Sequence, residues 1–490
     1  MEKGVAIKEL TLIDISDLKF FINGRWKKSF DHSTFEIKNP STEEILAKIP
    51  NGGRLDTNEA IKTASEAFPN WARLTADERG NYLLKLRDLL LAHDQEFASI
   101  ISLEMGKVKN QALAEVQQAS SFLTWYAEEG RRIYGETVPA SDPDKRLFVI
   151  KQPVGVVAAI TPWNFPLSML TRKLAPALAA GCTAILKPAE QGSLTAIAFA
   201  KLVEMANFPK GVINIVTGMP EPISDEFFAN PIVKKVSFTG STRVGRLLVK
   251  KSSHHLKKLS LELGGNAPFI VFEDADIQKA VEDAIASKFR NVGQTCICAN
   301  RIYVHEKVKK EFTQLFVDRV RQLTIGNSLD DGVEIGPLVN ESGLLKAESH
   351  VKDSVEKGAT VIQGGKRCSN LNGYYFEPTV LVGVTDDMMI MSEETFGPVA
   401  PIIPFSSIKE VITAANNTEY GLAAYVYTSN IERAVRTTES LQFGIIGLND
   451  AAPAVAQAPF GGMKLSGYGR EGGHQGISNF LEEKFVSLKI

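Results

Sequence analysis

One cysteine in a loop of small and polar residues is the strongest chemical signal in the sequence. Cys296 lies within residues 289–301 (FRNVGQTCICANR), directly after Gly293, Gln294 and Thr295. We expect this lead-in to hold the sulfur at a turn or helix terminus, where backbone N–H groups lower the pKa of a thiol below about 8.5. A thiol in such a setting is a good nucleophile. An isolated cysteine is more often a packing residue, so this interpretation depends on the rest of the chain.

Two further polar side chains lie in surroundings that suit acyl chemistry. Asn164 belongs to TPWNFP (161–166), where two prolines and two aromatic residues fix the loop. A rigidly held amide donor can stabilise an oxyanion. Glu262 lies in the apolar run LELGG (261–265), so desolvation should raise its pKa toward the range of a general base. A turn asparagine and a salt-bridged structural glutamate are the alternative interpretations.

Two segments at predicted strand ends indicate a dinucleotide site. FTGSTRVG (238–245) lies between a strand and a helix. Gly240 permits the turn, and the helix N-terminus offers free N–H groups to a phosphate. KPAE (187–190) places Lys187 and Glu190 beyond another strand end. A carboxylate there can bind both ribose hydroxyls of NAD but repels a 2′-phosphate, so the sequence favours NAD over NADP. An ordinary turn and a surface ion pair are the alternatives.

Predicted strands and helices alternate regularly along most of the chain. Helical spacing of apolar residues over 57–122 precedes the first set. Between 153 and 272, PVGVVAAI, TAILK, VINIV, KKVSF and PFIVF are predicted strands with helices between them. A second set, RIYVHE, TVIQGG, EPTVLVG and VAPIIPF, extends to about Phe443. This pattern indicates two α/β domains with parallel sheets, which bind ligands outside the carboxyl ends of their strands.

Two strand-like segments lie outside both sets. Residues 134–150 carry prolines and charges and are typical of an arm or an extended hairpin. Residues 483–490 (EKFVSLKI) alternate like a strand, with nothing after them to pair with. Strands in such positions indicate pairing within or across subunits, so we expect a homo-oligomer.

The composition excludes several classes of protein. The 490 residues are 44% hydrophobic and 23% charged, which is ordinary for an enzyme of two or three domains. A net charge of -2 gives no basic footprint for nucleic acid. Four cysteines form no disulfide framework, and no signal peptide or membrane-spanning run is present. Seven histidines show no metal-ligand spacing. We therefore expect a cytoplasmic enzyme without a metal site.

Together these motifs resemble the NAD(P)-dependent aldehyde dehydrogenase superfamily, in family order from about Phe21 to the end. The resemblance implies an α/β fold with a Rossmann-like cofactor domain, a catalytic domain and a β oligomerisation arm, in a dimer or tetramer. The implied boundaries are 1–131 and 151–263 for the cofactor domain, 264–450 for the catalytic domain, and 132–150 and 466–490 for the arm.

The resemblance also implies roles for individual residues. Cys296 would attack an aldehyde, Asn164 and the Cys296 N–H would hold the oxyanion, and Glu262 would activate the water that releases the acid. Lys173 matches a family lysine near the active site whose role stays open. The residues implied to bind the cofactor are Thr161, Trp163, Lys187, Glu190, Gly240, Ser241, Gly245, Leu263, Glu394 and Phe396.

Within the superfamily, GQTCICANR, EETFGPVAP and TRKLAPALAAG are most similar to succinate-semialdehyde dehydrogenases. In that subfamily two arginines bind the substrate carboxylate, and they match Arg172 and Arg290. Guanidinium groups favour an anionic tail through charge-assisted hydrogen bonds, although each arginine could instead form a structural ion pair. Val455 fills the place of a subfamily serine that helps bind the carboxylate, so glutarate semialdehyde and sulfolactaldehyde are alternative substrates.

Three further possibilities follow from the resemblance. The first is an aldehyde dehydrogenase of broader specificity. The second is a CoA-acylating enzyme, against which the presence of Glu262 argues. The third concerns Cys298, which matches a position where some relatives form a reversible disulfide with the catalytic cysteine. We state that redox switch as a hypothesis.

Overall fold

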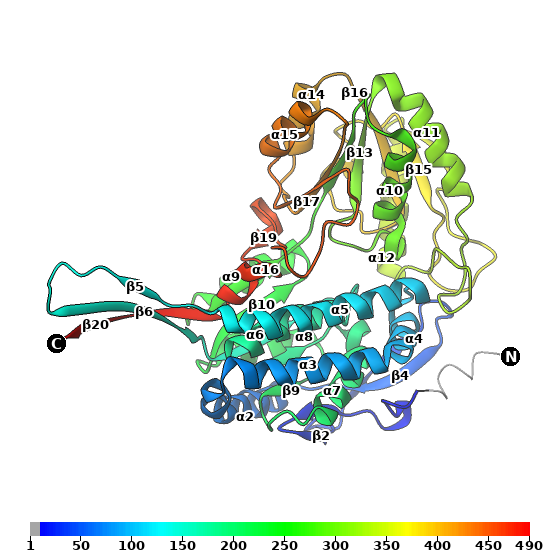
Figure 1. The fold of residues 1–490 in the computed structure, drawn as a ribbon. Helices are drawn as coiled ribbons and strands as arrows, with labels where there is room; N and C mark the ends of the chain where they lie inside the picture. The colour runs from blue at the N-terminus through cyan, green and yellow to red at the C-terminus, as the bar shows by residue number, and fades with distance from the viewer. Residues whose placement is uncertain (1–9) are drawn as a thin grey trace.

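A twisted eight-stranded sheet forms the centre of the lower half of the molecule in Figure 1. The computed structural model describes residues 10–490. The strand order is β19-β11-β10-β7-β8-β9-β1-β2, and β7 to β11 run parallel to one another. The strands are β1 (Phe20–Ile22), β2 (Arg25–Lys27), β7 (Val156–Ile160), β8 (Thr183–Lys187), β9 (Ile213–Ile215), β10 (Val233–Thr239), β11 (Lys258–Glu262) and β19 (Gly467–Tyr468).

The direction in which strands are added reverses between β7 and β10. Going from β7, the chain adds β8 and β9 on one side, and then returns to add β10 and β11 on the other. The loops that follow β7 and β10 therefore lie next to each other at a switch point, where doubly wound sheets bind ligands. These loops contain Asn164 and Ser241, so the fold brings two of the predicted motifs together.

Both faces of this sheet are covered by helices. Val157 and Ala159 of β7 pack into one core, whereas Val156, Ala158 and Ile160 pack into another on the opposite face. Such burial on both faces is typical of parallel sheets. The helical prediction for 57–122 is confirmed. The helices are α2 (Arg54–Arg73), α3 (Ala76–Ala92), α4 (Asp94–Met105), α5 (Lys109–Glu129), α6 (Ser168–Ala180), α7 (Ser193–Met205), α8 (Pro220–Ala229) and α9 (Thr242–Ser252).

A seven-stranded sheet forms the upper half, with the order β14-β15-β16-β13-β12-β17-β18. Helices α10 and α11 lie on one side of it, and α14 and α15 on the other (Figure 1). Its strands are β12 (Ala267–Val271), β13 (Ala299–His305), β14 (Thr360–Gln363), β15 (Thr379–Val382), β16 (Val399–Phe405), β17 (Ala423–Tyr427) and β18 (Ile445–Leu448). Its helices are α10 (Ile277–Phe289), α11 (Glu306–Arg321), α12 (Glu341–Glu356), α13 (Met389–Ser392), α14 (Ile408–Asn416) and α15 (Ile431–Ser440).

One predicted strand belongs to a different sheet than expected. We predicted that PFIVF completes the first alternating set, but it forms β12 between β13 and β17 in the second sheet. The place in the first sheet is taken by β11, which the prediction did not include. An apolar run shows that a strand is buried, but its periodicity does not show which sheet it joins.

The arm projects from the side of the molecule (Figure 1). It consists of β5 (Glu136–Val138), β6 (Lys145–Pro153) and β20 (Leu481–Lys489), and β20 pairs antiparallel with β6 along its whole length. Of the two predicted possibilities, pairing within or across subunits, the structure shows pairing of the final strand within the chain. β19 lies outside the arm, beside β11. The remaining elements include β3 (Thr34–Lys38), β4 (Ile45–Pro50) and α16 (Gly473–Ser478).

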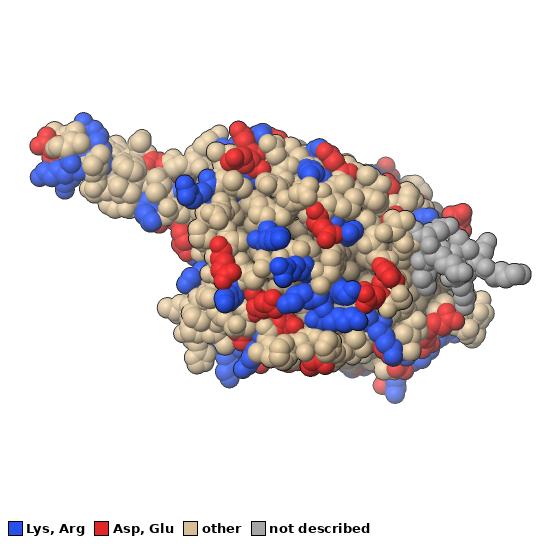
Figure 2. All heavy atoms as spheres, turned by 90° about the horizontal axis from the view of Figure 1, so that it is seen from below, with Lys and Arg blue, Asp and Glu red and all other residues tan. Residues whose placement is uncertain are grey.

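The sequence predictions also concern the charged surface, membrane spans and metal sites. On the face seen in Figure 2, basic side chains are interspersed with acidic ones, and several gather at the tip of the arm. Within residues 10–490, no helix has the length and apolar character needed to cross a bilayer. The same residues contain no group of three histidine, cysteine or acidic side chains that could hold a metal ion.

Candidate active site

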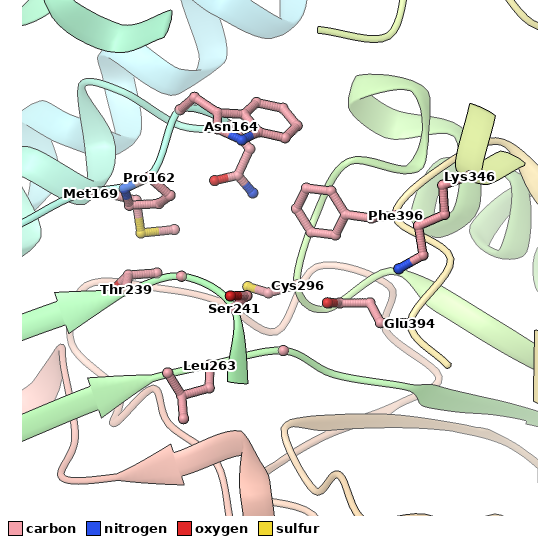
Figure 3. Close-up of a pocket in the computed structure, with 13 residues that line it drawn as sticks. Pro162, Asn164, Met169, Thr239, Ser241, Leu263, Cys296, Lys346, Glu394 and Phe396 are labelled. Carbon is pink, nitrogen blue, oxygen red and sulfur yellow. The ribbon is translucent and has the colours of Figure 1, made fainter. Parts of the chain in front are cut away.

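A cavity of about 260 Å³ lies between the strand ends of the two sheets (Figure 3). Its walls are formed by residues of the loops after β7, β10 and β11 on one side and by residues of the upper half on the other. The lining residues are Pro162, Trp163, Asn164, Met169, Thr239, Gly240, Ser241, Leu263, Gly264, Cys296, Lys346, Glu394 and Phe396. The fold thus places eight of the predicted site residues around one cavity.

Contacts on both sides fix the loop that carries the predicted nucleophile. A Cβ atom on Gly265 would come within 2.4 Å of the carbonyl oxygen of Cys296, so the second glycine of LELGG allows this close approach. On the other side, the Tyr425 hydroxyl donates a hydrogen bond of 2.7 Å to the Ile297 carbonyl. The preceding residues Asn291 and Val292 have φ values of 50° and 60°. Non-glycine residues rarely adopt this conformation, and it concentrates at functional sites.

The pKa of the Cys296 thiol differs from our prediction. Burial raises this pKa to about 12, and the nearby Arg172 guanidinium offsets only part of the increase. The prediction that the loop lowers the pKa of the Cys296 thiol is wrong for this structure, because a thiolate loses its solvation inside the cavity. The resting thiol is therefore protonated, and its attack requires a group that accepts the proton.

Two hydrogen-bond donors lie beside the sulfur. Figure 3 shows the Asn164 amide extending into the cavity near Cys296. In this structure its Nδ2 donates to the Gln294 carbonyl at 3.1 Å. The N–H of Cys296 has no acceptor in the described part of the chain. An amide and a free backbone N–H around one reacting centre are the components of an oxyanion hole.

Glu262 lies at the end of β11, behind the cavity wall. Its side chain is buried, and neither carboxylate oxygen has a hydrogen-bond partner among residues 10–490. Burial, followed by the negative charge of Glu471, raises the pKa of Glu262 well above its usual value of 4.5. The predicted increase is confirmed in direction. A carboxyl group with a raised pKa can accept a proton near neutral pH.

Lys173 faces the sheet and not the cavity. Its ammonium donates to the Thr239 hydroxyl at 2.7 Å and to the Ser237 hydroxyl at 3.3 Å, and it forms a direct ion pair with Glu471. Glu471 also lies 3.7 Å from an Arg172 nitrogen. A buried network of charges therefore connects Lys173 with Glu262, through a glutamate that sequence analysis missed.

A smaller cavity of about 20 Å³ adjoins the sulfur on the other side. Its lining residues are Gln118, Phe165, Met169, Arg172, Arg290, Thr295, Cys296, Ile297, Ala454 and Phe460. The two predicted arginines thus share a cavity with the predicted nucleophile. The cavity has room for about one water molecule, so side chains must move to admit a larger molecule.

The Arg172 guanidinium lies between two aromatic rings. Its central carbon is 4.3 Å from the Phe460 ring centroid and 4.9 Å from that of Phe122. Two of its nitrogens, Nε and Nη1, are buried without a hydrogen-bond partner in the described residues. Nη1 forms an ion pair with Glu471 at 3.7 Å, but this contact is too long for a hydrogen bond. Buried donors without hydrogen bonds are costly, so this arginine is suited to receive an anion.

Val455 does not have the position that we predicted. Its residue surface is 40% exposed, and its neighbour Ala454 is the residue of this loop that lines the cavity. The substrate role of Val455 stays a prediction without support from this geometry. A spacing argument cannot decide which of two adjacent loop residues faces inward, because loops lack a fixed side-chain period.

The loop after β10 provides a helix N-terminus and room for a phosphate. The Ser241 hydroxyl accepts a hydrogen bond of 3.3 Å from the Val244 N–H and so caps α9. A Cβ atom on Gly245 would come within 2.6 Å of Leu263, so this glycine lets α9 approach the end of β11. A helix N-terminus with open backbone in front of it is a suitable anion site. The residues present therefore fit a dinucleotide.

Lys187 and Glu190 form an ion pair at the end of β8, with 2.5 Å between nitrogen and oxygen. They lie beside the large cavity but not in its wall, and the Lys187 carbonyl accepts a hydrogen bond of 3.1 Å from the Thr161 N–H. Burial lowers the pKa of the Lys187 ammonium, and the Glu190 carboxylate opposes this. Their role in cofactor binding stays a prediction.

Aromatic and acidic side chains close the other end of the cavity. The rings of Trp163 and Phe396 meet edge to face, with 5.5 Å between centroids, and Phe396 has a φ of 51°. Glu394 accepts a hydrogen bond of 3.0 Å from the Gly265 N–H. Burial raises the pKa of Glu394 to about 7. Figure 3 shows Glu394 and Phe396 on the side of the cavity that belongs to the upper half.

Comparison with known proteins agrees with this geometry. Residues 26–486 match the aldehyde dehydrogenase family. The chain belongs to that family. It is 49% identical to the succinate-semialdehyde dehydrogenase [NADP(+)] GabD of Escherichia coli, over 96% of this chain and 97% of that protein.

Two further proteins are similar over nearly the whole chain. A glutarate-semialdehyde dehydrogenase of Pseudomonas aeruginosa is 47% identical, over 97% of this chain and 99% of that protein. The crystal structure of succinate-semialdehyde dehydrogenase from Burkholderia pseudomallei matches with a TM-score of 0.96 and 47% identity, over 97% of this chain and 99% of that one. The predicted aldehyde dehydrogenase fold is therefore confirmed.

Several residues around the cavities of this aldehyde dehydrogenase were not predicted. Lys346 of α12 lines the large cavity and lowers the pKa of Glu394, although burial has the larger, opposite effect. Phe165 and Phe460 line the small one. A lone lysine in a helix and a phenylalanine in a loop carry no distinctive local pattern, so only the fold reveals them.

The second thiol of the nucleophile loop is free. Cys298 is buried, and its sulfur donates weakly to the Lys288 carbonyl at 3.5 Å. Burial raises the pKa of this thiol, and the Lys288 ammonium opposes that effect. The hypothesis of a reversible disulfide with Cys296 stays a prediction.

Proposed function

We propose that this aldehyde dehydrogenase oxidises a small aldehyde with an anionic tail to the corresponding acid, with succinate semialdehyde as the preferred substrate. One observation carries the proposal. The Arg172 guanidinium shares a cavity with Cys296 and has two buried nitrogens without a hydrogen-bond partner in the described residues. A carboxylate at the far end of a short aldehyde would pair with this charge while its carbonyl carbon reaches the sulfur. The names of the similar proteins agree with this substrate class.

The chain supplies the following steps. Because burial raises the thiol pKa to about 12, Cys296 begins as a thiol. Its sulfur attacks the aldehyde carbon, and its proton is released to solvent as the carbon–sulfur bond forms. The Asn164 amide and the Cys296 N–H hold the oxygen of the resulting hemithioacetal. The residues around the large cavity would hold a nicotinamide cofactor, which would supply the hydride acceptor needed to oxidise this adduct to a thioester. Glu262, whose pKa burial has raised, then takes a proton from the water that releases the acid.

The substrate proposal is tested by comparing aldehydes of similar size. We expect kcat/KM for succinate semialdehyde to exceed that for butanal by at least about tenfold, because losing one charged partner in a buried pocket costs about 2–5 kcal/mol. Cys296→Ala provides the blank. Glutarate semialdehyde and sulfolactaldehyde identify the preferred anion. Equal values for succinate semialdehyde and butanal would contradict an anion site.

We also propose that NAD is preferred over NADP. The Glu190 carboxylate lies at the end of β8, where it can bind ribose hydroxyls and would repel a 2′-phosphate. The similar Escherichia coli protein is named for NADP(+), so the cofactor is a point on which the two proteins are expected to differ.

The cofactor proposal is tested by the ratio of kcat/KM values for NAD and NADP. We expect Glu190→Gln to shift this ratio toward NADP by at least about tenfold, because like charges in close contact cost several kcal/mol. Glu204→Gln is a matched control, since Glu204 also pairs with a lysine three residues earlier, Lys201, but on the outside of α7. An unchanged ratio in Glu190→Gln would exclude the proposed role.

The arm supports a homo-oligomer, as a dimer or tetramer. Phe485 of β20 and Ile490 after it are 60% and 69% exposed, which is unusual for apolar side chains on a projecting sheet. A second copy of the chain would cover them. The cytoplasmic location stays a prediction.

A further inference from the structure

We propose that Lys107 and Glu115 are positioning residues that hold the Asn164 amide in place beside the reacting carbon. The inference rests on the oxyanion role of Asn164 in the proposed function. Lys107 lies between α4 and α5, and Glu115 lies in the second turn of α5. Lys107 and Glu115 line neither cavity, although α5 contributes Gln118 to the wall of the small one.

The lysine binds the backbone of the residue that carries the amide. Lys107 and Glu115 expose 1% and 2% of their residue surface and form a direct ion pair. The Lys107 ammonium also donates a hydrogen bond of 2.7 Å to the Asn164 carbonyl oxygen. It lies 3.7 Å from the centroid of the Phe165 ring. One buried cation therefore contacts two consecutive residues of the loop after β7.

The glutamate fixes the end of the same loop. One oxygen of Glu115 accepts hydrogen bonds from the N–H groups of Leu167 at 2.9 Å and Ser168 at 3.1 Å. Ser168 begins α6, and a carboxylate at a helix N-terminus is favourable. Since α6 also carries Arg172, Glu115 holds both the amide loop and the helix of the anion-binding arginine.

The Asn164 carbonyl is a junction between this pair and the nucleophile loop. It accepts a second hydrogen bond, of 3.1 Å, from the Asn291 side-chain amide, which also donates to Gln294 at 3.2 Å. The Asn291 N–H in turn donates to the Gln111 side chain of α5 at 2.7 Å. Without Lys107, the carbonyl would keep only the donor from the nucleophile loop. The amide could then shift relative to Cys296, and a misplacement of about 1 Å can cost about 10²-fold in rate.

Two other buried charged residues hold helix ends without contacting the amide loop, and one of them provides a control. Glu104 is also fully buried and binds the N–H groups of Leu194 and Thr195 at the start of α7, but it does not contact the amide loop. Arg79 is a buried cation that donates to the Ala179 carbonyl at 2.9 Å, at the opposite end of α6 from Ser168. Arg79→Met removes a buried cation from a backbone carbonyl, as Lys107→Met does, but far from Cys296.

The test is a double-mutant cycle on the rate constant of the first turnover. This rate constant is measured from NADH formation after the NAD complex is mixed with succinate semialdehyde. We expect Asn164→Ala to lower the rate constant by about 10²- to 10³-fold and Lys107→Met to lower it by about 10- to 100-fold. In the Asn164→Ala background, Lys107→Met should lower it further by less than about threefold, because its effect acts through that amide. The effect of Arg79→Met should be the same in both backgrounds. Aldehyde KM should change by less than about threefold in Lys107→Met.

Two results would overturn the positioning role of Lys107 and Glu115. If Lys107→Met has its full effect without the Asn164 amide, the pair is only structural, and the proposed function stands. If Asn164→Ala retains the wild-type rate constant, the oxyanion role and this inference both fall. Glu115→Gln repeats the cycle with a side chain of the same shape, which still accepts the two N–H groups of α6. It keeps the proposal testable if Lys107→Met does not fold.

Discussion

Replacing Arg172 by methionine should remove the preference for anionic aldehydes. The guanidinium is buried between two aromatic rings, beside the cavity that it shares with Cys296. Loss of one charged partner in such a site costs about 2–5 kcal/mol. Because every 1.4 kcal/mol is a factor of about ten, kcat/KM for succinate semialdehyde should fall by about 30-fold to several thousandfold.

A neutral aldehyde separates anion binding from the other effects of this arginine. Arg172 also lowers the pKa of Cys296 and of Glu262, although burial outweighs it at both groups. Its removal therefore slows butanal and succinate semialdehyde alike. The ratio of the two kcat/KM values cancels this common loss, so we expect the ratio to fall by at least about 30-fold in Arg172→Met.

The assay follows NADH formation with both aldehydes at saturating NAD, and Arg79→Met is the control. Arg79 is also a buried arginine, and it packs against the far end of α6. Its replacement should leave the ratio of the two kcat/KM values unchanged. A ratio in Arg172→Met that stays within about threefold of wild type would show that Arg172 is structural, and the substrate proposal would lose its main support.

Three further predictions concern the base, the thiol and the arm. Glu262→Gln should retain a first turnover of one NADH per site but lower kcat by about 10²- to 10⁴-fold. A steady rate of NADH formation without this burst would contradict the assigned role of Glu262. Wild-type kcat should rise with pH above 4.5 as the Glu262 carboxyl loses its proton. Alkylation of Cys296 by iodoacetamide should still accelerate above about pH 10, because burial raises its pKa, whereas a plateau near pH 8 would exclude this. Phe485→Asp should shift the mass measured by light scattering toward a single chain, and an unchanged mass would show that this exposed side chain is outside the subunit contact.

Local sequence patterns predicted the part of the site that lies at strand ends. Asn164 and Ser241 follow β7 and β10, and Glu262 ends β11. Parallel strands that neighbour one another have their carboxyl ends at the same edge, so motifs that follow such strands must lie close together. Because of this constraint, residues separated by up to about 100 positions in the sequence could be assigned to one site without a structure.

Contacts between distant segments and the effects of burial were beyond such patterns. Glu471 pairs with Lys173 across 298 positions, and no spacing rule connects them. The Cys296 pKa was predicted in the wrong direction, because the loop sequence suggests nearby N–H groups but does not show how far the fold excludes water. The proposed roles of Lys107 and Glu115 also depend on contacts with a distant loop, so the helical pattern of their own segment does not predict them.

The buried charges of this protein fall into two kinds, and the difference indicates their purpose. Glu115 and Lys107 have hydrogen-bond partners on backbone groups as well as each other. By contrast, Arg172 and Glu262 have buried nitrogens and oxygens without a hydrogen-bond partner in the described residues, although Arg172 lies in an ion pair with Glu471. Buried polar atoms without hydrogen bonds lower stability, and at these two groups the substrate or the reacting water would complete the bonding. The fully paired ion pair fixes the loop and helix on which the unpaired groups depend.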